Sequence, residues 1–311
     1  MFYQIFLLIV GLFLLIKGAD FIVSGATSIA KRFHLSEILI GIVIVGIGTS
    51  LPEIIVTVES TLKGNQDIIL GNSIGSCICN LLLVLGIACV FKTIKIDTKL
   101  LQIHLPVSAI TIMLLIAFCN FGNPSNTITR SEGIVLLIIA LIYIGYTIYE
   151  GKEEAENDIN TENIGLFRVL IYLVLGILGL KFGADFVVSG AVSIAEFFNL
   201  SESIISITIV SIGTSLPEII TAITASVRNE SDLVIGNVIG SNIFNICLLP
   251  AIGAIISPIK YDFEFNKSII FLLIVTLYLL VFDLFRNKRE LGRKHGIVFI
   301  LLFSLYIACL F

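Results

Sequence analysis

The segment GIGTSLPE at residues 46–53 returns as SIGTSLPE at residues 211–218. Each copy places a proline and a glutamate inside an otherwise apolar run. Because proline has no N–H, Pro52 cannot donate to the carbonyl of Gly48, and its ring pushes that helical turn open. Within the membrane, non-helical backbone is tolerated only where it is buried in protein or lines a polar cavity. An ionisable residue at the same depth indicates a functional site. Each copy therefore predicts a broken helix with a cation site beside Glu53 or Glu218.

The composition indicates a membrane protein. Of 311 residues, 57% are hydrophobic and 14% charged, and the mean hydropathy is +1.06. Uncharged runs of about 20 residues, the length that spans a bilayer as a helix, recur along the chain. We expect an all-α integral membrane protein in a lipid bilayer, with no nucleic-acid partner. Ten spans are predicted, at residues 2–28, 37–61, 67–91, 100–119, 131–149, 166–193, 202–226, 232–256, 267–285 and 295–311.

The two halves of the chain are copies of each other. Glu53 returns as Glu218 and Asn72 as Asn237, both at an offset of 165, and residues 18–80 match residues 183–245 at about 36 of 63 positions without a gap. Five spans per half is an odd number, so the second copy enters the membrane from the opposite side, which makes an inverted repeat. We expect a first five-helix repeat at residues 1–150, a cytoplasmic acidic linker at 151–164 and a second repeat at 165–311, with helices 2 and 7 broken.

The basic residues predict the orientation. Of 19 Lys and Arg, 13 fall in one set of alternate loops, four in the other, and Lys17 and Lys181 lie within spans. Since basic residues concentrate in cytoplasmic loops, the richer set is expected in the cytoplasm. This places a multi-pass protein in the cell membrane with both termini outside.

Polar side chains recur at helical spacing around the two glutamates. Thr49 and Glu53 are four residues apart, as are Thr214 and Glu218, so each pair is expected on one helix face. The next span of each half carries a polar stripe, listed here for both copies: Asn72, Ser76 and Asn80, then Asn237, Ser241 and Asn245. Hydroxyl, amide, carbonyl and carboxylate oxygens are hard ligands that suit sodium, calcium or magnesium.

Structural roles are the alternatives for these residues. A lone glutamate can be protonated and hydrogen-bonded within a bundle, and small polar residues often join membrane helices. Close helix packing alone accounts for Gly71, Gly75, Gly236 and Gly240. For Asp20 and Asp185 we expect local pairing with Lys17 and Lys181 on the same helix. Duplication of the whole GTSLPE segment favours an ion site for the glutamates.

The paired GTSLPE segments, each followed by GN-x-IGS-x-I-x-N in the next span, resemble the two α-repeats of sodium/calcium exchangers, within the calcium:cation antiporter superfamily. The likeness covers both halves and is to the compact prokaryotic members. It implies that Glu53 and Glu218 form the central acidic pair shared by calcium and sodium. It also implies that the first and sixth helices are long, tilted and able to slide.

The resemblance implies the remaining ligands residue by residue. Backbone oxygens of Thr49 and Thr214 would complete the calcium site, and Ser50 and Ser215 would serve flanking sodium sites. The other implied ligands are the carbonyls of Gly46 and Ser211 and the side chains of Ser76, Asn80, Ser241 and Asn245. Some relatives have Asp in place of Asn245, so this site holds two formal charges and potassium dependence is not expected.

The sequence therefore predicts a secondary active antiporter that exchanges sodium for calcium by alternating access. Exchange of three sodium ions for one calcium would be electrogenic. Calcium/proton exchange through the same glutamates is the alternative, and a passive channel or a membrane scaffold is disfavoured by the inverted repeat. No nucleophile–base pair or dinucleotide loop indicates an enzyme. We expect calcium and sodium as transported ions, no cofactor, and a monomer as sufficient for transport.

Overall fold

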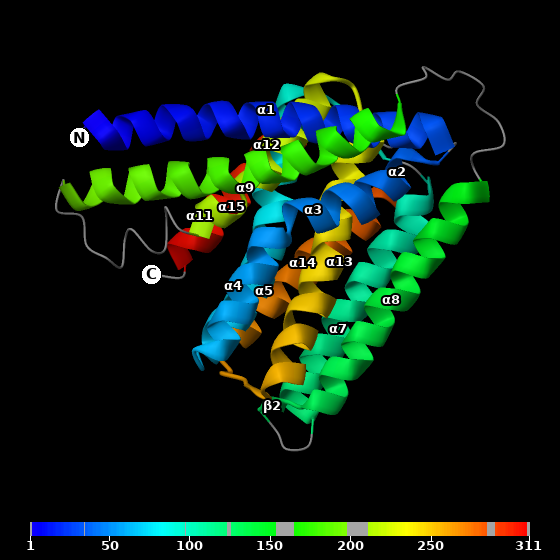
Figure 1. Ribbon diagram of the computed structural model, residues 1–311. Coiled ribbons are helices and arrows are strands. Elements are labelled where there is room, and N and C mark those ends of the chain that lie inside the picture. Colours follow the sequence, from blue (N-terminus) through cyan, green and yellow to red (C-terminus); the bar gives the residue numbers. More distant parts are fainter. Residues whose placement is uncertain are drawn as a thin grey trace.

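A computed structural model describes residues 2–33, 35–96, 98–122, 126–153, 165–197, 211–284 and 290–309. Side chains of residues 152–153, 195–197, 211–212 and 282–284 are outside this description. Most of the linker predicted at 151–164 and the start of the span predicted at 202–226 also lie outside it. Within the described residues the chain is almost entirely helical, as the apolar runs predicted (Figure 1).

Helices occur at all of the predicted spans. In the first half they are α1 (Phe2–Phe33), α2 (Glu37–Ile40), η1 (Gly41–Gly46), α3 (Ile47–Thr49), α4 (Leu51–Leu62), α5 (Gln66–Ile78), η2 (Cys79–Val84), α6 (Leu85–Phe91), η3 (Leu100–His104), α7 (Leu105–Phe121) and α8 (Arg130–Glu153). In the second half they are α9 (Leu166–Phe197), α11 (Ser211–Thr214), α12 (Leu216–Val227), α13 (Ser231–Ile256), α14 (Phe265–Leu284) and α15 (Arg293–Cys309).

Among the described helices, six are long and apolar enough to cross a bilayer. A seventh span is the bent pair formed by residues 37–49 and 51–62, whose two parts meet at 44°. The helix Leu216–Val227 and the segment Phe265–Val281 are apolar but shorter. This is a helical membrane protein with at least six apolar spans.

Both predicted breaks are present, and both have the same backbone geometry. Ser50 separates α3 from α4 with φ −82° and ψ 6°, and Ser215 separates α11 from α12 with φ −89° and ψ 4°. These angles lie in the sparsely populated bridge region. Pro52 and Pro217 each stand in the first turn of the following helix, where a missing N–H costs little.

Two kinds of element were not predicted. Three segments, η1, η2 and η3, form π-helical turns within spans two, three and four. Such widened turns are often found at functional sites. In addition, β1 (Ile94–Lys95) pairs with β4 (Glu290–Leu291), and β2 (Thr127–Ile128) pairs with β3 (Ile259–Lys260), so the chain is not purely α. Each strand has two residues, which is too short for a detectable period-2 pattern.

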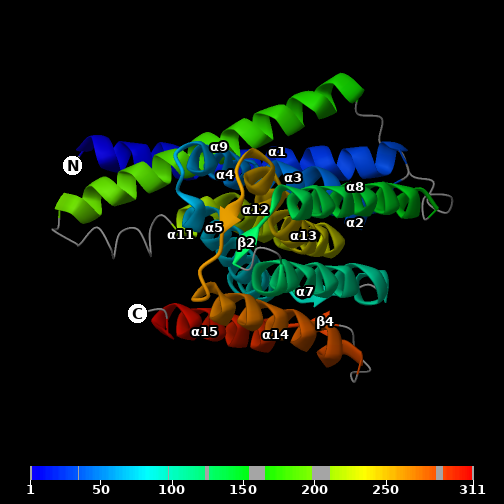
Figure 2. The same ribbon diagram turned by 90° about the horizontal axis from the view of Figure 1, so that it is seen from below.

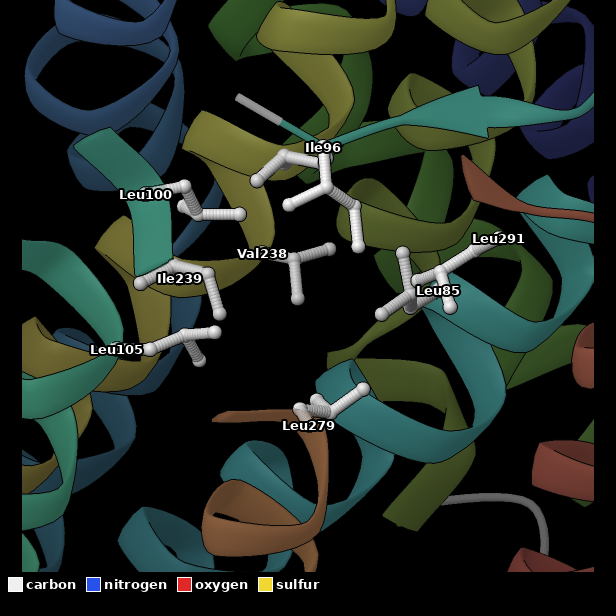
Figure 3. A pocket seen from close by; sticks show the side chains of 9 residues that line it. Leu85, Ile96, Leu100, Leu105, Val238, Ile239, Leu279 and Leu291 are labelled. Carbon is white, nitrogen blue, oxygen red and sulfur yellow. The ribbon is translucent and has the colours of Figure 1, made fainter. Parts of the chain in front are cut away.

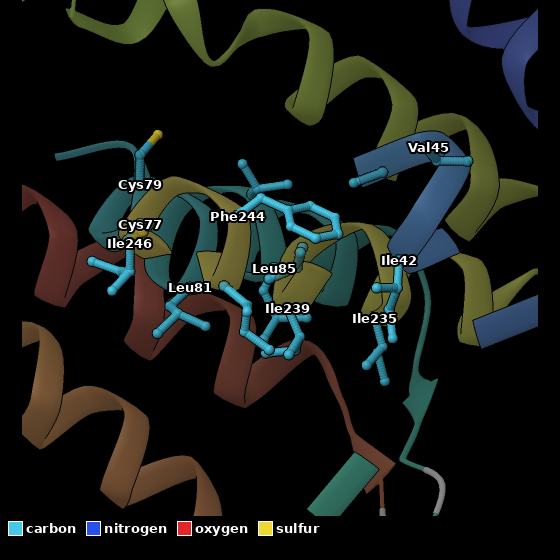
Figure 4. Packing of buried hydrophobic residues seen from close by; sticks show 14 of the residues in the cluster. Ile42, Val45, Cys77, Cys79, Leu81, Leu85, Ile235, Ile239, Phe244 and Ile246 are labelled. Carbon is cyan, nitrogen blue, oxygen red and sulfur yellow. The ribbon is translucent and has the colours of Figure 1, made fainter. Parts of the chain in front are cut away.

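The centre of the molecule is α13. Its side chains are buried around its whole circumference, and Figure 4 shows Ile235, Ile239 and Phe244 among residues of η1, η2 and α6. Glycines on α13 allow unusually close packing on span two. A Cβ at Gly236 would lie 2.6 Å from the Ile38 carbonyl oxygen, and one at Gly240 would lie 2.7 Å from the Ile42 Cα.

In the first repeat, Gly71 and Gly75 are also expected to pack closely, and for Gly75 this prediction is wrong. A Cβ at Gly75 would meet no atom within 4 Å, and one at Gly71 would meet only the Phe265 ring, at 3.6 Å. The two copies have the same residues here but different neighbours. Close packing therefore follows from the position of α13 in the bundle and not from the repeated motif.

The equivalent helices α5 and α13 of the two halves run in opposite directions. At one end of the bundle, Gln66 at the start of α5 donates 2.9 Å to the carbonyl of Pro258, just beyond the end of α13. Farther along, Ser73 donates 2.6 Å to the carbonyl of Asn245, and Cys77 lies against Asn242. Rising residue numbers in α5 thus lie beside falling residue numbers in α13, so these two helices are antiparallel, which is consistent with the predicted inverted repeat.

The two longest helices, α1 and α9, lie together along one side of this bundle (Figures 1 and 2). They run antiparallel and meet at glycines, because a Cβ at Gly11 would lie 2.8 Å from the Gly183 carbonyl oxygen and one at Gly18 would lie 2.7 Å from the Leu180 nitrogen. Small residues at such contacts let membrane helices approach closely. We call α1 and α9 together the α1–α9 pair.

The expected local charge pairs are only partly present. Lys17 lies 3.8 Å from Asp20, but the shorter contact of Asp20 is to Arg228 in the turn between α12 and α13, at 2.8 Å. Lys181 lies over the ring of Phe182 instead of pairing with Asp185. The expectation for Asp185 is therefore wrong, because the Lys181 side chain takes up the aromatic face of its neighbour.

Candidate functional site

The break in one half contacts the glutamate of the other half. The Ser50 hydroxyl donates 3.4 Å to Oε1 of Glu218, across 168 positions of sequence. Ser50 lies three residues before Glu53, at the break of the first half. Glu53 is 0% exposed and Glu218 1%, so neither charge is stabilised by bulk water. The structure therefore brings the two predicted acids into one buried region.

The widened end of span two is held by α13. Thr49 donates 3.1 Å to Oδ1 of Asn237, and the Gly46 carbonyl accepts hydrogen bonds from Ser241 at 3.2 Å and from Thr49 at 3.4 Å. A Cβ at Gly46 would lie 3.2 Å from the Ser241 nitrogen. Since α13 approaches this turn so closely, a polar stripe from the second half lies directly against the break of the first.

On the other side of the same region, α5 contacts both halves. Asn72 donates 3.3 Å to the Glu53 carbonyl, and Ser76 is buried one helical turn farther along α5. The bond from Ser73 to the Asn245 carbonyl joins α5 to α13. The stripes expected on spans three and eight thus both contact span two beside its break, and the helices that carry them contact each other.

Several buried polar atoms in this region have no hydrogen-bond partner among the described residues. They are both carboxylate oxygens of Glu53, Oε2 of Glu218, the hydroxyl of Ser215 and both side-chain amide atoms of Asn80 and Asn245. Leaving one such atom buried and unpaired costs about 1–3 kcal/mol, and more when it is charged. This concentration of unpaired oxygens is unfavourable in an empty protein interior. It fits a site whose oxygens bind cations.

The donor set determines which cations suit the site. Two carboxylates supply two negative charges, and hydroxyl, amide and carbonyl groups supply neutral oxygens. Calcium takes 6–8 oxygen ligands in flexible geometry, and sodium also prefers oxygen. Within the described residues, no group of three or more His, Cys, Asp or Glu could hold a metal ion. The arrangement can therefore bind a hard cation largely through neutral oxygens around one pair of acids.

Eleven of the twelve predicted ligands have described side chains or, for Gly46, a described carbonyl. Thr49 and Ser241 both donate hydrogen bonds to the Gly46 carbonyl, and Ser50 donates one to Glu218. Ser76, Asn80, Ser215 and Asn245 are buried, and Thr214 is half-buried at the end of α11. The twelfth, Ser211, begins α11, but its side chain is outside the described residues.

The four-residue spacing of Thr49 and Glu53 predicts that they share one helix face. The predicted helix break falls between them. Because the helix breaks at Ser50, Thr49 ends α3 and Glu53 belongs to α4, which runs at 44° to the preceding segment. Thr49 instead points its hydroxyl toward Asn237.

The structure adds polar residues that the predicted ligand set lacked. Asn237 and Asn72 make the contacts described above. The hydroxyls of Thr57 and Thr221 are also buried without a partner among the described residues. Thr57 follows Glu53 by four positions and Thr221 follows Glu218 by three, so helical spacing from each glutamate could have identified both.

A separate cavity is apolar and is not part of this site. Figure 3 shows the carbon-only side chains that surround it. Its lining consists of Leu85, Ile96, Leu100, Leu105, Ile235, Val238, Ile239, Leu279 and Leu291. A cation would lose its hydration there without gaining oxygen ligands. The polar region around the two glutamates is thus the candidate functional site.

Comparison with known proteins gives a family match across both halves. The family described as sodium/calcium exchanger protein matches residues 3–149 and 168–311. An uncharacterized membrane protein of Methanocaldococcus jannaschii is 35% identical over 284 residues, which is 91% of this chain and 89% of that protein. The sodium/calcium exchanger MaX1 of Methanosarcina acetivorans is 26% identical over 98% of this chain and 97% of its own.

Solved structures agree with these matches. A structure of the sodium-calcium exchanger NCX_Mj, soaked with zero Na⁺ and Ca²⁺, superimposes with a TM-score of 0.86 at 33% identity and covers 99% of each chain. A more distant relative, vacuolar cation/proton exchanger 3 of Arabidopsis thaliana, is 24% identical over 83% of this chain and 64% of that protein.

Proposed function

Because this chain belongs to the sodium/calcium exchanger protein family, we propose that it is a secondary active antiporter that exchanges sodium for calcium. One observation carries the proposal: Glu53 and Glu218 are buried at two helix breaks, with three of their four carboxylate oxygens lacking a hydrogen-bond partner among the described residues. Transporter sites are commonly formed by broken helices where two repeats meet. The structural likeness to the sodium-calcium exchanger NCX_Mj supports sodium and calcium as the ions.

The two acids are the charged ligands in this proposal. Glu53 and Glu218 bind either calcium or sodium, so one cargo excludes the other and the two fluxes are coupled. Oxygens of Thr49 and Thr214 complete the calcium site. The sodium sites use the remaining ligands, which are Ser50, Ser215, Gly46, Ser211, Ser76, Asn80, Ser241 and Asn245.

Charge balance supports electrogenic exchange. Two carboxylates neutralise one calcium ion but leave net positive charge when three sodium ions are bound. A cycle with that ratio moves one net charge across the membrane. The net charge moved during exchange therefore measures how many sodium ions are exchanged for each calcium ion.

The architecture we assign is ten membrane helices in two inverted five-helix repeats, at residues 1–150 and 165–311, joined by a cytoplasmic linker. The antiparallel contacts of α5 with α13 support the inversion. The excess of basic residues in alternate loops supports cytoplasmic placement of the linker and places both termini outside. Alternating access then moves the α1–α9 pair relative to the breaks, and the glycine contacts of that pair suit sliding.

Calcium/proton exchange is the second candidate, and the cation/proton exchanger among the distant relatives favours it. In that reaction, protons replace sodium on the same two glutamates. The neutral amides of Asn80 and Asn245 favour the sodium reaction, because they can bind sodium but take no proton near neutral pH.

Proteoliposomes decide between these reactions. Vesicles loaded with sodium are diluted into sodium-free buffer containing calcium, and calcium uptake is followed with and without a proton gradient. We expect uptake to require the sodium gradient and to be lost in Glu53→Gln. Uptake driven by protons alone would favour the second candidate, and uptake that needs neither gradient would contradict both.

A further inference from the structure

An ion pair ties the α1–α9 pair to the turn between α12 and α13. Arg228 donates from Nη2 to Oδ1 of Asp20 at 2.8 Å and from Nη1 to the Ser24 hydroxyl at 2.7 Å. Asp20 and Ser24 lie one turn apart on α1, so one guanidinium engages two positions of the same helix face. Arg228 is 208 positions away in sequence from Asp20, so this contact depends on how α1 lies against the second repeat.

Every member of this contact has a repeat counterpart. At the offset of 165, Asp20 corresponds to Asp185, Ser24 to Ser189, and Arg228 to Lys63. A symmetrical molecule would therefore form a second contact between Asp185 on α9 and Lys63 in the turn between α4 and α5. The structure has only the first. Asp185 is exposed without an ion-pair partner among the described residues, and Lys63 pairs with Glu59 at 3.4 Å.

The two turns lie at opposite ends of the bundle. Ser226, next to Arg228, donates 3.0 Å to the carbonyl of Ala88 near the end of α6. Gln66, close to Lys63, instead contacts Pro258 beyond the end of α13. Figure 1 shows the α4 end and the α12 end on different sides of the molecule. The Asp20–Arg228 contact and the Asp185–Lys63 contact would therefore hold the α1–α9 pair at opposite ends of the bundle.

Packing of the α1–α9 pair has the same asymmetry. Helix α1 packs along α12, but the repeat-related packing of α9 along α4 is not found to a comparable extent among the described helices. An alternating-access transporter built from inverted repeats has two states in which such contacts exchange roles. The described arrangement corresponds to one of them.

The sequence gives a reason why the Asp20–Arg228 contact forms and the Asp185–Lys63 contact does not. Glu59 lies four positions before Lys63 and can pair with it on the same helix. The residue four positions before Arg228 is Thr224, which offers no charge. Arg228 is therefore available to Asp20, whereas Glu59 competes with Asp185 for Lys63. Arginine also presents a fork that bonds two partners at once, which lysine does not.

From these contacts we propose that Asp20 and Arg228 form an ionic lock that positions the α1–α9 pair in one transport state, and that Asp185 and Lys63 form its counterpart in the other. The proposal rests on the proposed alternating-access function. Asp20 and Arg228 are 35% and 37% exposed, so the lock biases the equilibrium modestly and still permits sliding.

Distances between spin labels test the lock directly. Phe13→Cys on α1 and Val227→Cys at the end of α12 are exposed positions for the labels, in a Cys309→Ser background because the other cysteines are buried. Arg228→Gln should lower the ratio of the described state to the alternate state by about two- to fivefold. Glu59→Gln should also lower the ratio of the described state to the alternate state, because Lys63 becomes free to pair with Asp185. Lys63→Gln should raise this ratio.

Two controls make the result decisive. Arg168→Gln removes a charge from an exposed site on α9 and should leave the distances unchanged. The exchanged pair Asp20→Arg with Arg228→Asp should restore the wild-type ratio. An unchanged ratio in Arg228→Gln, or no restoration by the exchange, overturns the lock. Absence of sodium-driven calcium uptake in the wild type would instead overturn the proposed function, because the distances report the lock without transport.

Discussion

The Ser50 hydroxyl donates 3.4 Å to Oε1 of Glu218, so the break of the first repeat contacts the acid of the second. Both side chains are 1% exposed. The contact shows that the two repeats build one region together. Changes in either repeat should therefore affect the same ions.

Removal of one acid should weaken calcium binding strongly. In Glu53→Gln and in Glu218→Gln the site loses one of its two charges, and calcium affinity depends on ligand charge. We expect sodium-driven calcium uptake to fall by about 10- to 100-fold in proteoliposomes. Glu264→Gln, an exposed carboxylate in the loop before α14, is the matched control and should retain uptake. Equal loss in all three variants would contradict the assignment.

Addition of an acid should have the opposite effect. Asn245 is buried and its amide atoms have no partner among the described residues. If Asn245 is a ligand as proposed, Asn245→Asp adds a third charge to the site and should tighten calcium binding by about tenfold, because more ligand charge favours a divalent ion. Calcium titration of the purified protein by calorimetry measures this. Unchanged calcium affinity at neutral and alkaline pH would show that Asn245 lies outside the ion site.

Ser50→Ala should have an intermediate effect. The variant removes a neutral donor to Glu218, and hydrogen bonds to charged groups contribute about 1.5–3 kcal/mol. Because the carboxylate remains, we expect a smaller loss of uptake than in Glu218→Gln. The comparison uses initial rates across a calcium range in the same vesicles. A loss as large as that of Glu218→Gln would show that Ser50 itself is a principal ligand.

The repeat provides two equivalent glycines whose substitution by alanine should affect the stability of the protein differently. Gly240→Ala forces a Cβ to 2.7 Å from the Ile42 Cα, which should destabilise the protein by about 1–3 kcal/mol. Its counterpart Gly75→Ala meets no atom within 4 Å and should be neutral or stabilising by about 0.5–1 kcal/mol. Thermal unfolding in detergent measures both. Equal melting temperatures would contradict the described packing of α13 on η1.

Much of the fold could be predicted locally. Apolar runs identify helices because bilayer thickness sets their length, and Pro52 and Pro217 identify breaks because their rings exclude a helical hydrogen bond. The π-helical turns and two-residue strands could not be predicted. Their geometry depends on contacts with distant segments, such as the close approach of Gly240 to Ile42 and the pairing of Ile94 with Leu291.

The candidate site, like the fold, could be predicted from the sequence only in part. Glu53 and Glu218 are recognisable in the sequence because a charge in an apolar run is costly and the repeat duplicates it. The partners of Thr49 and Asp20 are not recognisable, because Asn237 and Arg228 lie 188 and 208 positions away. Thr49 and Asp20 each keep a local contact, with Gly46 and Lys17, and three-dimensional packing adds the distant partner at a shorter distance.

By itself, the sequence determined the helical membrane class, the internal repeat, the broken helices and the identity of the two acids. These follow from the cost of exposing backbone and charge to lipid, which acts on each segment separately. Only the tertiary structure decided that equivalent residues of the two repeats differ in environment. Gly240 packs tightly while Gly75 does not, and Arg228 holds Asp20 while Lys63 pairs with Glu59. The physical reason is that nearly identical segments acquire different neighbours once the bundle adopts one asymmetric arrangement.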